Sequence, residues 1–550
     1  MLIPNGGERD VTPPRVVKYM PDSAAVNFRS GEINLFFNEY IQLKDVNNQL
    51  IVSPPLEEPP VIKLLKYKIL NIKFSKPLKE NTTYTLSFGN SIADYNEGNV
   101  LEGFQYVFST GSFIDSLSIG GKIQNAFDHK TEKGILVMLY DAEALKGDSV
   151  PYKELPSYFT RTKPDGSYKI TNLRAGKYRI FALKDENKNY KYDAEAEWIG
   201  FSDKLVEPGS KANCDMELCK EIPGKIKLKS VVAAGYGHLL FAFNKPVANL
   251  SIDPLNIKKV PTEIVEYSKN KDSLNYWFAG VPNDSLILQL TDNNVVIDTC
   301  RVRLITKEHA LKSPKGEKLK LAVSSNTVSG QKFDLNKDLQ LKFNNPLKEF
   351  KAFRFDSIKK LISDTSRFEH HSVDLLWHND KRTLYFNSHI FCHELKINNL
   401  TGVTDTVFWG YSGIWNEEHT YTYLFLPGAF TDIFENVNDT FKIEFKTQEL
   451  KFYGTLKLKF SLPQEGNYVL QFLDGKDGVV KEDVLKSSKT FNYEYIPPGS
   501  YKLKLIYDTN GNGKWDSGNF LGKVQPEKVV YYDLPIVVRS NWDMEIEWKP

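Results

Sequence analysis

The stretch EINLFFNEYI at residues 32–41 shows the pattern that decides the fold. Apolar side chains alternate with other residues up to Phe37, and an asparagine follows where the chain must turn. Alternation with a period of two is typical of a β-strand with one buried face, and asparagine is a common turn residue. The stretch therefore predicts a strand that ends at a corner of a β-sandwich.

The same corner occurs twice more in the chain. FNKPV at residues 243–247 and FNNPL at residues 343–347 repeat the aromatic residue, the asparagine and the residues that leave the sheet. Each copy follows an alternating strand, so each places an aromatic side chain toward a core directly before a turn. Three copies of one corner predict three related sandwiches.

Length and composition indicate several β-domains. A chain of 550 residues is several times the usual size of one core, which predicts about three to five domains. The hydrophobic fraction of 41% and the charged fraction of 25% are ordinary for folded protein. Because helical periodicity is nearly absent, we predict an all-β chain of tandem sandwiches, each of about 100 residues.

Charge and motifs argue against several functions. The 71 basic and 69 acidic residues are mixed along the chain and give a net charge of +2, so we expect no nucleic-acid-binding surface. No stretch approaches the roughly 20 apolar residues of a membrane-spanning helix. Because the chain has neither a Gly-x-Ser-x-Gly motif nor a glycine-rich phosphate loop, we expect it not to be an enzyme.

The cysteines and histidines are interpreted as ordinary structural residues. The four cysteines are too few and too scattered for a disulfide framework: Cys214, Cys219, Cys300 and Cys392. Six residues of types that bind zinc lie close together in the sequence: His370, His371, His378, His389, Cys392 and His393. On a strand, His389 and Cys392 would point to opposite faces, so we predict no zinc site here.

The N-terminal part carries a longer set of motifs. They are DVTPPRVV at 10–17, FSKPL at 74–78, NTTYTL at 81–86 and YVFSTG at 106–111. Together with the corner at Phe37, they resemble the bacterial Ig-like domain of the SbsA type over residues 10–112. Closing strands of similar form at residues 303–306 and 443–447 imply Ig-like units at 221–309 and, with insertions, at 310–448.

A second repeat has a different character. NLRAGKYRI at residues 172–180 aligns without gaps with YIPPGSYKL at residues 495–503. This L-x-x-G-x-Y strand resembles the prealbumin-like sandwich of carboxypeptidase regulatory-like, or Cna-B-like, modules. The resemblance implies prealbumin-like domains at residues 113–220 and 449–550.

The order of these modules resembles a family of Bacteroidota envelope lipoproteins. In that family an Ig-like domain begins near a lipidated cysteine and is followed by a prealbumin-like module, and residues 1–9 look like the linker after the lipid anchor. The resemblance implies an outer-membrane protein that is lipid-anchored and exposed at the cell surface. We expect a non-catalytic binding or scaffold protein, an accessory subunit of an outer-membrane protein assembly, secretion or uptake complex.

Two loops follow the prealbumin-like repeats and share a spacing of oxygen-bearing residues. The positions are Asp185, Asn187, Asn189, Lys191 and Asp193 in the first loop, and Asp508, Asn510, Asn512, Lys514 and Asp516 in the second. With the backbone carbonyl of each lysine, they match the first part of an EF-hand calcium loop, and Gly513 stands at the sharp turn. Neither loop has glutamate at position twelve. Structural calcium is one hypothesis, and simple Asx-turns are the alternative.

An aromatic-rich stretch is the remaining candidate surface. Trp409, Tyr411 and Trp415 would form stacking platforms for a glycan, or a contact surface for a protein partner, if their rings are exposed. Glycan binding at the cell surface is therefore the alternative function. Burial of these rings in the core of the third Ig-like unit, at residues 310–448, is the competing interpretation.

Overall fold

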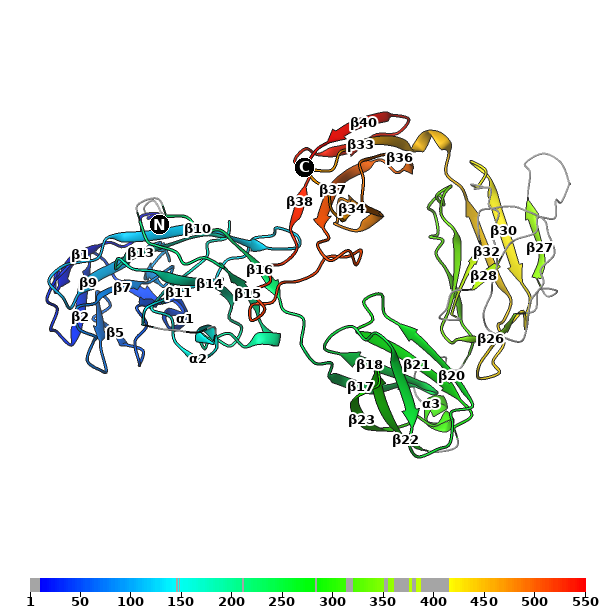
Figure 1. The fold of residues 1–550 in the computed structure, drawn as a ribbon, viewed down its shortest axis with the longest axis horizontal. Helices are drawn as coiled ribbons and strands as arrows, with labels where there is room; N and C mark the ends of the chain where they lie inside the picture. The colour runs from blue at the N-terminus through cyan, green and yellow to red at the C-terminus, as the bar shows by residue number, and fades with distance from the viewer. Residues whose placement is uncertain are drawn as a thin grey trace, which may run out of the picture. The chain divides into compact units, whose positions relative to one another are not determined.

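The computed structural model describes residues 10–144, 147, 149–209, 212–281, 284–312, 320–350, 355–360, 375–377, 382–386 and 415–550 (Figure 1). In these residues α-helices are short, as in α1 (Val46–Gln49), α2 (Val150–Lys153) and α3 (Lys307–Lys312). Strands paired into sheets form most of the regular structure of these residues. The prediction of an all-β fold is confirmed. No helix in the described part of the chain is long and apolar enough to span a bilayer.

The chain forms two compact units. The first consists of Met1–Ile222 with Gly466–Leu470 and Leu505–Val530, and the second of Pro223–Glu465, Gln471–Lys504 and Tyr531–Pro550. Each sheet is confined to one of the five ranges expected from the sequence, 10–112, 113–220, 221–309, 310–448 and 449–550. We call these ranges modules one to five.

Module one is a sandwich with a continuous core. The first sheet has the order β1 (Val16–Met20), β2 (Glu32–Phe37), β6 (Ile69–Lys73), β5 (Val61–Leu65). The second has the order β4 (Ile51–Ser53), β7 (Thr83–Ser87), β9 (Gln105–Ser109). A smaller sheet pairs β3 (Ile41–Leu43) with β8 (Ile92–Asp94). The strand expected at 32–37 is β2, and its alternate residues Ile33, Leu35 and Phe37 are buried. They pack with Leu86 and Phe108 from the facing sheet.

The repeated corner has the same hydrogen bond in modules one, three and four. The side-chain oxygen of Asn38 accepts a 2.8 Å bond from the backbone N–H of Arg15. The corresponding bonds run at 2.8 Å from Lys227 N–H to Asn244 and from Ala322 N–H to Asn344. Each asparagine thus ties its corner to the residue just before the strand that pairs with the strand ending at that corner. Modules one, three and four therefore share one corner contact.

Module two is one curved sheet. Its strand order is β12 (Tyr158–Arg161), β11 (Leu136–Asp141), β14 (Tyr178–Lys184), β15 (Trp198–Phe201), β16 (Met216–Lys220), β10 (Leu117–Asn125), β13 (Ser167–Leu173). The repeat at 172–180 leads from β13 into β14, where the hydroxyl of Tyr178 donates to the carbonyl of Arg174 at 3.0 Å. Tyr501 makes the equivalent bond to Pro497 at 2.7 Å. The L-x-x-G-x-Y motif therefore encodes a tyrosine that closes its own turn.

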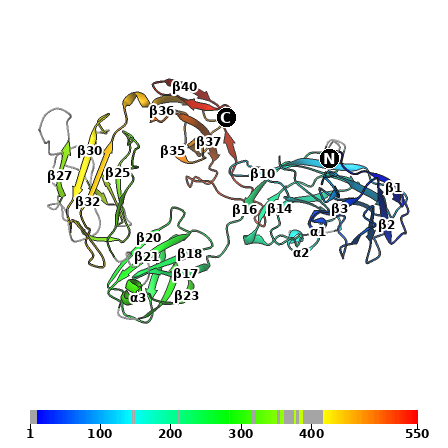
Figure 2. The same cartoon turned by 180° about the vertical axis from the view of Figure 1, so that it is seen from behind.

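Modules three and four are built from further antiparallel sheets, and Figure 2 shows those of module three from behind. In module three, one sheet has the order β17 (Leu228–Gly235), β18 (His238–Phe243), β21 (Ser273–Ala279), β20 (Thr262–Tyr267). The other has the order β19 (Leu250–Pro254), β22 (Ser285–Asp292), β23 (Val295–Arg303).

In module four, one sheet has the order β24 (Val323–Ser325), β25 (Leu339–Phe343), β29 (Thr383–Phe386), β28 (Leu375–Trp377). A second sheet pairs β26 (Leu347–Phe350) with β31 (Phe430–Asp432). A third has the order β27 (Phe355–Lys360), β30 (Thr420–Phe425), β32 (Phe441–Lys446).

Module five contains the second tyrosine-closed repeat. Its sheets have the orders β36 (Lys489–Ile496), β33 (Gly454–Phe460), β40 (Asp543–Trp548), and β35 (Val479–Leu485), β34 (Tyr468–Asp474), β37 (Gly499–Tyr507), β38 (Val529–Tyr531), with β39 (Ile536–Val538) beside β37. The pairing of β33 with β40 is parallel, as is that of β10 with β16 in module two. Modules two and five therefore share a parallel strand pair as well as the tyrosine motif.

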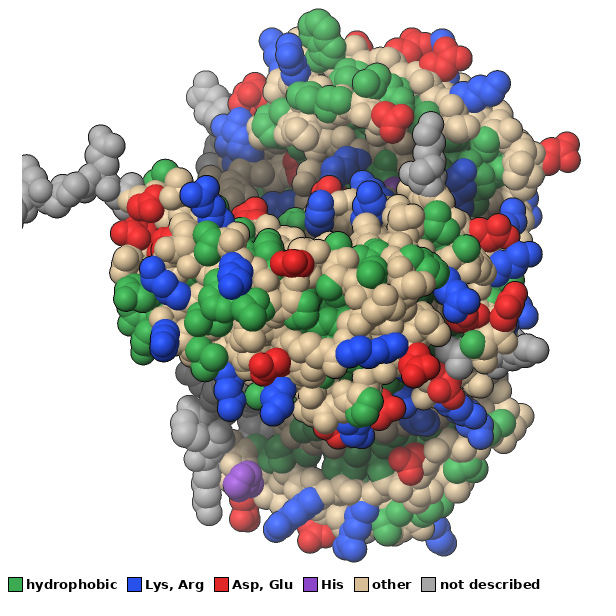
Figure 3. Space-filling view, turned by 90° about the vertical axis from the view of Figure 1, so that its left-hand side faces the viewer, with side chains coloured by type: hydrophobic (Ala, Val, Ile, Leu, Met, Phe, Trp, Pro, Cys, Tyr) green, Lys and Arg blue, Asp and Glu red, His purple; other side chains and the backbone are tan. Residues whose placement is uncertain are grey.

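Charged side chains of both signs are mixed on the face drawn in Figure 3. Hydrophobic side chains lie there in small patches, separated by Lys, Arg, Asp and Glu. On this face no single-sign patch dominates.

Candidate functional site

The second aspartate loop (residues 508–516) follows β37 and folds around its first residue. Asp508 is 1% exposed. Its carboxylate accepts hydrogen bonds from the backbone N–H groups of Gly511 at 2.8 Å, Asn512 at 3.0 Å and Gly513 at 2.8 Å. Gly511 and Gly513 have φ of 74° and 80°, a region that glycine enters at little cost. The loop is a tight turn closed around a buried carboxylate.

The first aspartate loop (residues 185–193) follows β14 and is closed in the same way. The carboxylate of Asp185 accepts hydrogen bonds from the N–H groups of Asn189 at 3.2 Å and Tyr190 at 3.1 Å. Lys188 and Tyr190, with φ of 62° and 61°, stand where the second loop has glycines. For residues other than glycine this conformation costs roughly 1–2 kcal/mol. The first loop therefore makes the same turn at a higher backbone cost.

In both loops the side chains at positions three and five point to the side chain at position nine. The amides of Asn510 and Asn512 each donate to Oδ2 of Asp516 at 2.5 Å. The corresponding bonds of the first loop run from Asn187 and Asn189 to Oδ2 of Asp193. The structure thus brings together the side chains that the sequence singles out at positions one, three, five and nine.

These side chains carry the oxygen atoms that calcium prefers, but they supply fewer of them than calcium usually binds. Calcium takes about six to eight oxygen ligands, and each loop offers four oxygen-bearing side chains plus the carbonyl of Lys191 or Lys514. A bound ion also requires the asparagine oxygens to face inward. In this structure the amide nitrogens face the aspartate at position nine, and the oxygens accept backbone N–H groups. Across the described residues, no three His, Cys, Asp or Glu side chains are placed to hold a metal. The loops therefore fit at most a weak calcium site, completed by water.

Two buried glutamates that sequence reasoning did not assign complete the loops. Glu197, 1% exposed, accepts 3.0 Å bonds from the N–H groups of Glu186 and Asp193. Burial raises the pKa of Glu197, and the carboxylates of Asp185 and Asp193 add to the rise against the two N–H donors.

Glu527 has the same role in the second loop. It is 5% exposed and accepts bonds from the N–H groups of Thr509 at 2.6 Å and Asp516 at 3.0 Å. These are loop positions two and nine, the positions that Glu197 binds in the first loop. The two glutamates lie at different sequence distances from their loops, so no fixed spacing could reveal them.

Residues 517–526 separate the second aspartate loop from Glu527, and we call them the clasp segment. The clasp segment belongs to the first unit together with module two. The ring of Phe520 lies 5.2 Å from that of Phe181, 5.3 Å from Phe201 and 6.0 Å from Tyr152, measured between centroids. Phe520 is 7% exposed and is part of a module-two core cluster.

Polar contacts fix the clasp segment around this ring. The N–H of Phe520 donates to Glu221 at 2.6 Å, and the hydroxyl of Tyr192 donates to the other oxygen of Glu221 at 2.5 Å. Burial raises the pKa of Tyr192, and the bond to Glu221 raises it further. Ser517 donates to the carbonyl of Lys220 at 2.6 Å. The segment is therefore anchored at its backbone as well as by its aromatic side chain.

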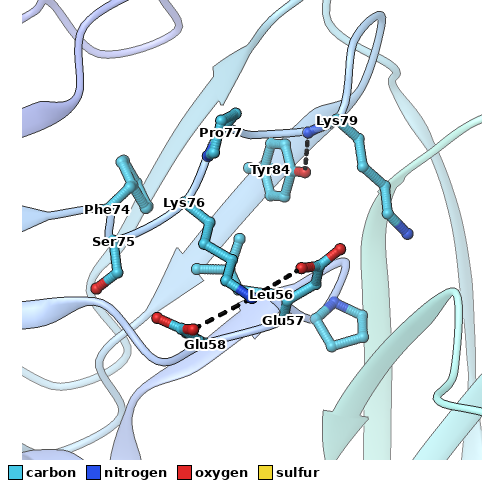
Figure 4. Close-up of a pocket in the computed structure, with 10 residues that line it drawn as sticks. Leu56, Glu57, Glu58, Phe74, Ser75, Lys76, Pro77, Lys79 and Tyr84 are labelled. Carbon is cyan, nitrogen blue, oxygen red and sulfur yellow. Dashed lines mark hydrogen bonds and ion pairs between the residues drawn. The ribbon is translucent and has the colours of Figure 1, made fainter.

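Two adjoining cavities lie along residues 54–58 within the first unit. The larger, of 540 Å³, lies between modules one and two and has both Asp115 and Arg174 in its lining. The smaller, of 30 Å³, is drawn in Figure 4, where Lys76 forms ion pairs with Glu57 and Glu58. It has room for little more than a water molecule. The larger has the volume of a small-molecule site, but its mixed charges favour no single class of ligand.

The aromatic stretch of module four is only partly described. Trp409 and Tyr411 lie outside the described residues, as do the six histidines and cysteines between 370 and 393. Trp415 is 6% exposed, and its indole donates to the carbonyl of Lys337 at 2.6 Å. It packs against Tyr421 in the core of module four. The expectation of an exposed platform is therefore wrong for Trp415, because the sandwich core needs its large ring.

The fold places this chain in the class of multi-module β-sandwich proteins. Residues 10–110 match the family model described as a bacterial Ig-like domain, Big_5, which supports the resemblance seen in module one. No curated protein matches this chain.

Several solved structures are similar to the chain at low identity. The TIE protein of Bacillus anthracis is 12% identical, with 99% of this chain and 75% of that chain covered and a TM-score of 0.14. The S-layer protein rSbsC(31-844) is 11% identical, with 95% and 67% covered and a TM-score of 0.14. BcpA, the major pilin subunit of Bacillus cereus, is 11% identical, with 79% and 99% covered and a TM-score of 0.13. Similarity at this level gives no basis for transferring arrangement or function.

Proposed function

We propose that this chain is a non-catalytic binding and scaffold protein of the bacterial cell envelope. In this proposal it is anchored to the outer membrane by a lipid, faces the cell surface, and serves as an accessory subunit of a protein assembly, secretion or uptake complex. The bacterial Ig-like domain at residues 10–110 supports an envelope role. The resemblance of the module order to Bacteroidota lipoproteins supports the outer membrane.

The clasp segment is the observation that carries the scaffold role. Modules joined only by linkers move relative to one another by default. Here a ring from the C-terminal part of the chain is buried among Tyr152, Phe181 and Phe201 of module two. Such a contact makes the clasp segment part of the folded first unit. A folded unit assembled from parts that are distant in sequence supports a scaffold role better than a flexible tether does.

The contact between modules one and two supports the same role. Ser53 Oγ accepts the N–H of Phe159 at 3.1 Å, and Thr85 bonds to Asn172 at 3.3 Å. Asn172 also donates to the carbonyl of Asp115, in the segment that joins the two modules, at 3.2 Å. Side chains of both modules therefore replace a free linker with a defined junction.

The test is purification of the tagged protein from its native envelope in mild detergent, followed by mass spectrometry. We expect an outer-membrane protein to co-purify in a stoichiometric amount. Phe520→Ala, which opens the clasp, should reduce that amount, whereas Leu521→Ala at the neighbouring exposed position should not. Recovery of the wild-type protein alone would reject the accessory-subunit role.

We further propose that calcium, where it binds, stiffens the two aspartate loops and takes no part in chemistry. The convergence of oxygen-bearing side chains on Asp193 and Asp516 supports this role. Extracellular calcium is plentiful enough to fill weak sites.

A further inference from the structure

Three exposed tyrosines lie side by side at one end of module one. Tyr40, Tyr67 and Tyr95 are 54%, 59% and 54% exposed. The ring centroids of Tyr40 and Tyr67 are 6.4 Å apart, and those of Tyr67 and Tyr95 are 5.7 Å apart. Tyr40 directly precedes β3, Tyr67 lies in the turn between β5 and β6, and Tyr95 directly follows β8. We call them the tyrosine cluster.

The backbone fixes the three positions relative to one another. The N–H of Ile41 donates to the carbonyl of Tyr67 at 2.7 Å, and the N–H of Tyr95 donates to the carbonyl of Tyr40 at 2.9 Å. Because these bonds link the three segments directly, the rings are held together before any ligand arrives. Such preorganisation lowers the entropic cost of binding.

The segment after Tyr95 is shaped by one buried carboxylate. Asp94, 1% exposed, accepts the N–H groups of Glu97 at 2.6 Å, Gly98 at 2.9 Å and Asn99 at 2.8 Å. These bonds close the chain into a tight loop directly behind Tyr95. Asp94 is therefore a positioning residue for this edge of the tyrosine cluster.

The turn that carries Tyr67 is strained. Lys66 and Tyr67 both have positive φ, 50° and 53°, and the N–H of Lys68 closes the turn on Leu65 at 3.2 Å. Turns with two positive φ values favour asparagine and glycine, which take this conformation with little strain. Strained backbone of this kind concentrates at functional sites. The turn thus carries a large ring at a position where glycine would cost less.

The surroundings of the cluster favour a carbohydrate over a protein as ligand. Within the described residues, none of the three tyrosine hydroxyls has a hydrogen-bond partner. Glu39, Lys66 and Lys68 lie next to the rings in sequence, and the ammonium of Lys68 is 5.0 Å from the ring of Tyr40. Lysine and glutamate are depleted in the cores of protein interfaces. Ring faces that carry hydroxyls without a partner suit a sugar, which has apolar C–H faces and polar hydroxyls.

We propose that the tyrosine cluster binds a glycan chain, with sugar faces stacked on the rings and sugar hydroxyls bonded to the tyrosine hydroxyls and the charged side chains. The planes of neighbouring rings are inclined at 80° and 66°. Rings that are not coplanar match a curved chain better than a flat one. This inference goes beyond the scaffold role and does not depend on it.

The test is isothermal titration of the full-length protein with two neutral probes of opposite shape, maltohexaose and cellohexaose. We expect the curved maltohexaose to bind and the flat cellohexaose to bind at least tenfold more weakly. Replacing Tyr40 or Tyr95 by alanine should weaken maltohexaose binding at least tenfold. Replacing either by phenylalanine should weaken it less, because the ring remains. Tyr267→Ala, at an exposed tyrosine of module three, is the matched control and should have no effect.

Tyr67→Gly keeps the test valid if an alanine variant unfolds. Glycine suits the positive φ at this position, so the variant should fold at least as well as the wild type while lacking the ring. Maltohexaose binding that survives Tyr67→Gly would overturn the proposal, as would failure of the wild type to bind either probe. Loss of a co-purified protein partner from Tyr67→Gly, without any glycan binding by the wild type, would assign the cluster to a protein partner instead.

Discussion

The backbone N–H of Phe520 donates a 2.6 Å hydrogen bond to the carboxylate of Glu221, a residue 299 positions earlier in the chain. Glu221 directly follows the last strand of module two, and Phe520 is the buried aromatic residue of the clasp segment. The contact therefore joins the end of module two to the clasp segment, within the first unit. Both Glu221 and Phe520 are buried, so the contact depends on the fold and not on surface charge.

Replacing Phe520 by alanine should release the clasp segment. Truncation of a buried phenylalanine costs about 3–5 kcal/mol, because it removes apolar burial and leaves a cavity. We expect faster hydrogen exchange at the amides of the clasp segment and of Glu221 in the full-length protein. The control is Leu521→Ala, since Leu521 is 62% exposed and its truncation removes little buried surface. Equal exchange in the two variants would show that the Phe520 ring does not hold the segment.

Replacing Glu527 by glutamine should loosen the second aspartate loop. One carboxylate oxygen accepts the N–H of Thr509 and the other accepts that of Asp516. The amide of glutamine faces one of these donors with another donor, and the unpaired buried group costs about 1–3 kcal/mol. Thermal unfolding should detect the loss. Glu494→Gln, at an exposed position of β36, should change the melting temperature little.

Calcium should raise the melting temperature if the aspartate loops bind it. A weak extracellular site with a Kd near 1 mM, at about 10 mM calcium, stabilises the folded state by about 1.4 kcal/mol. We expect the melting temperature in calcium to exceed that in a chelator, and the difference to vanish when Asp193 and Asp516 are both changed to asparagine. No difference for the wild-type protein would favour plain Asx-turns.

Acid should weaken module one through Asp94. Burial alone raises the pKa of Asp94, but the N–H donors of Gly98, Asn99 and Glu97 together hold it below 3.8. Because the folded pKa is the lower one, the carboxylate stabilises the folded state fully above about pH 3.8. This contribution is lost as the pH falls through the folded value.

The measurement is thermal unfolding of the full-length protein as a function of pH. The wild type should lose stability below pH 4 more steeply than Asp94→Asn, which has no charge to titrate. Asp284→Asn, at an exposed aspartate of module three, should follow the wild type. Parallel curves for the wild type and Asp94→Asn would show that the Asp94 carboxylate does not contribute to the acid sensitivity.

The sequence predicted how the side chains of the second aspartate loop converge, but it did not predict the glutamate that completes the loop. The spacing of Asp508, Asn510, Asn512 and Asp516 predicted that these side chains converge, because a local turn depends on neighbouring residues. The glutamate that completes the loop, Glu527, is separated from it by the clasp segment. Its role depends on where that segment returns, which local sequence does not specify.

The sequence by itself determined the all-β fold and the repeated corners. Alternation fixes which face of a strand is buried, and an aromatic residue followed by asparagine marks the corners at Phe37, Phe243 and Phe343. Tyr178 and Tyr501 likewise close their own turns. Only the tertiary structure decided that Trp415 is buried, that Phe520 enters module two, and that Tyr40, Tyr67 and Tyr95 meet. These outcomes depend on segments that are distant in sequence and are brought together by packing, which alternation and turn motifs do not encode.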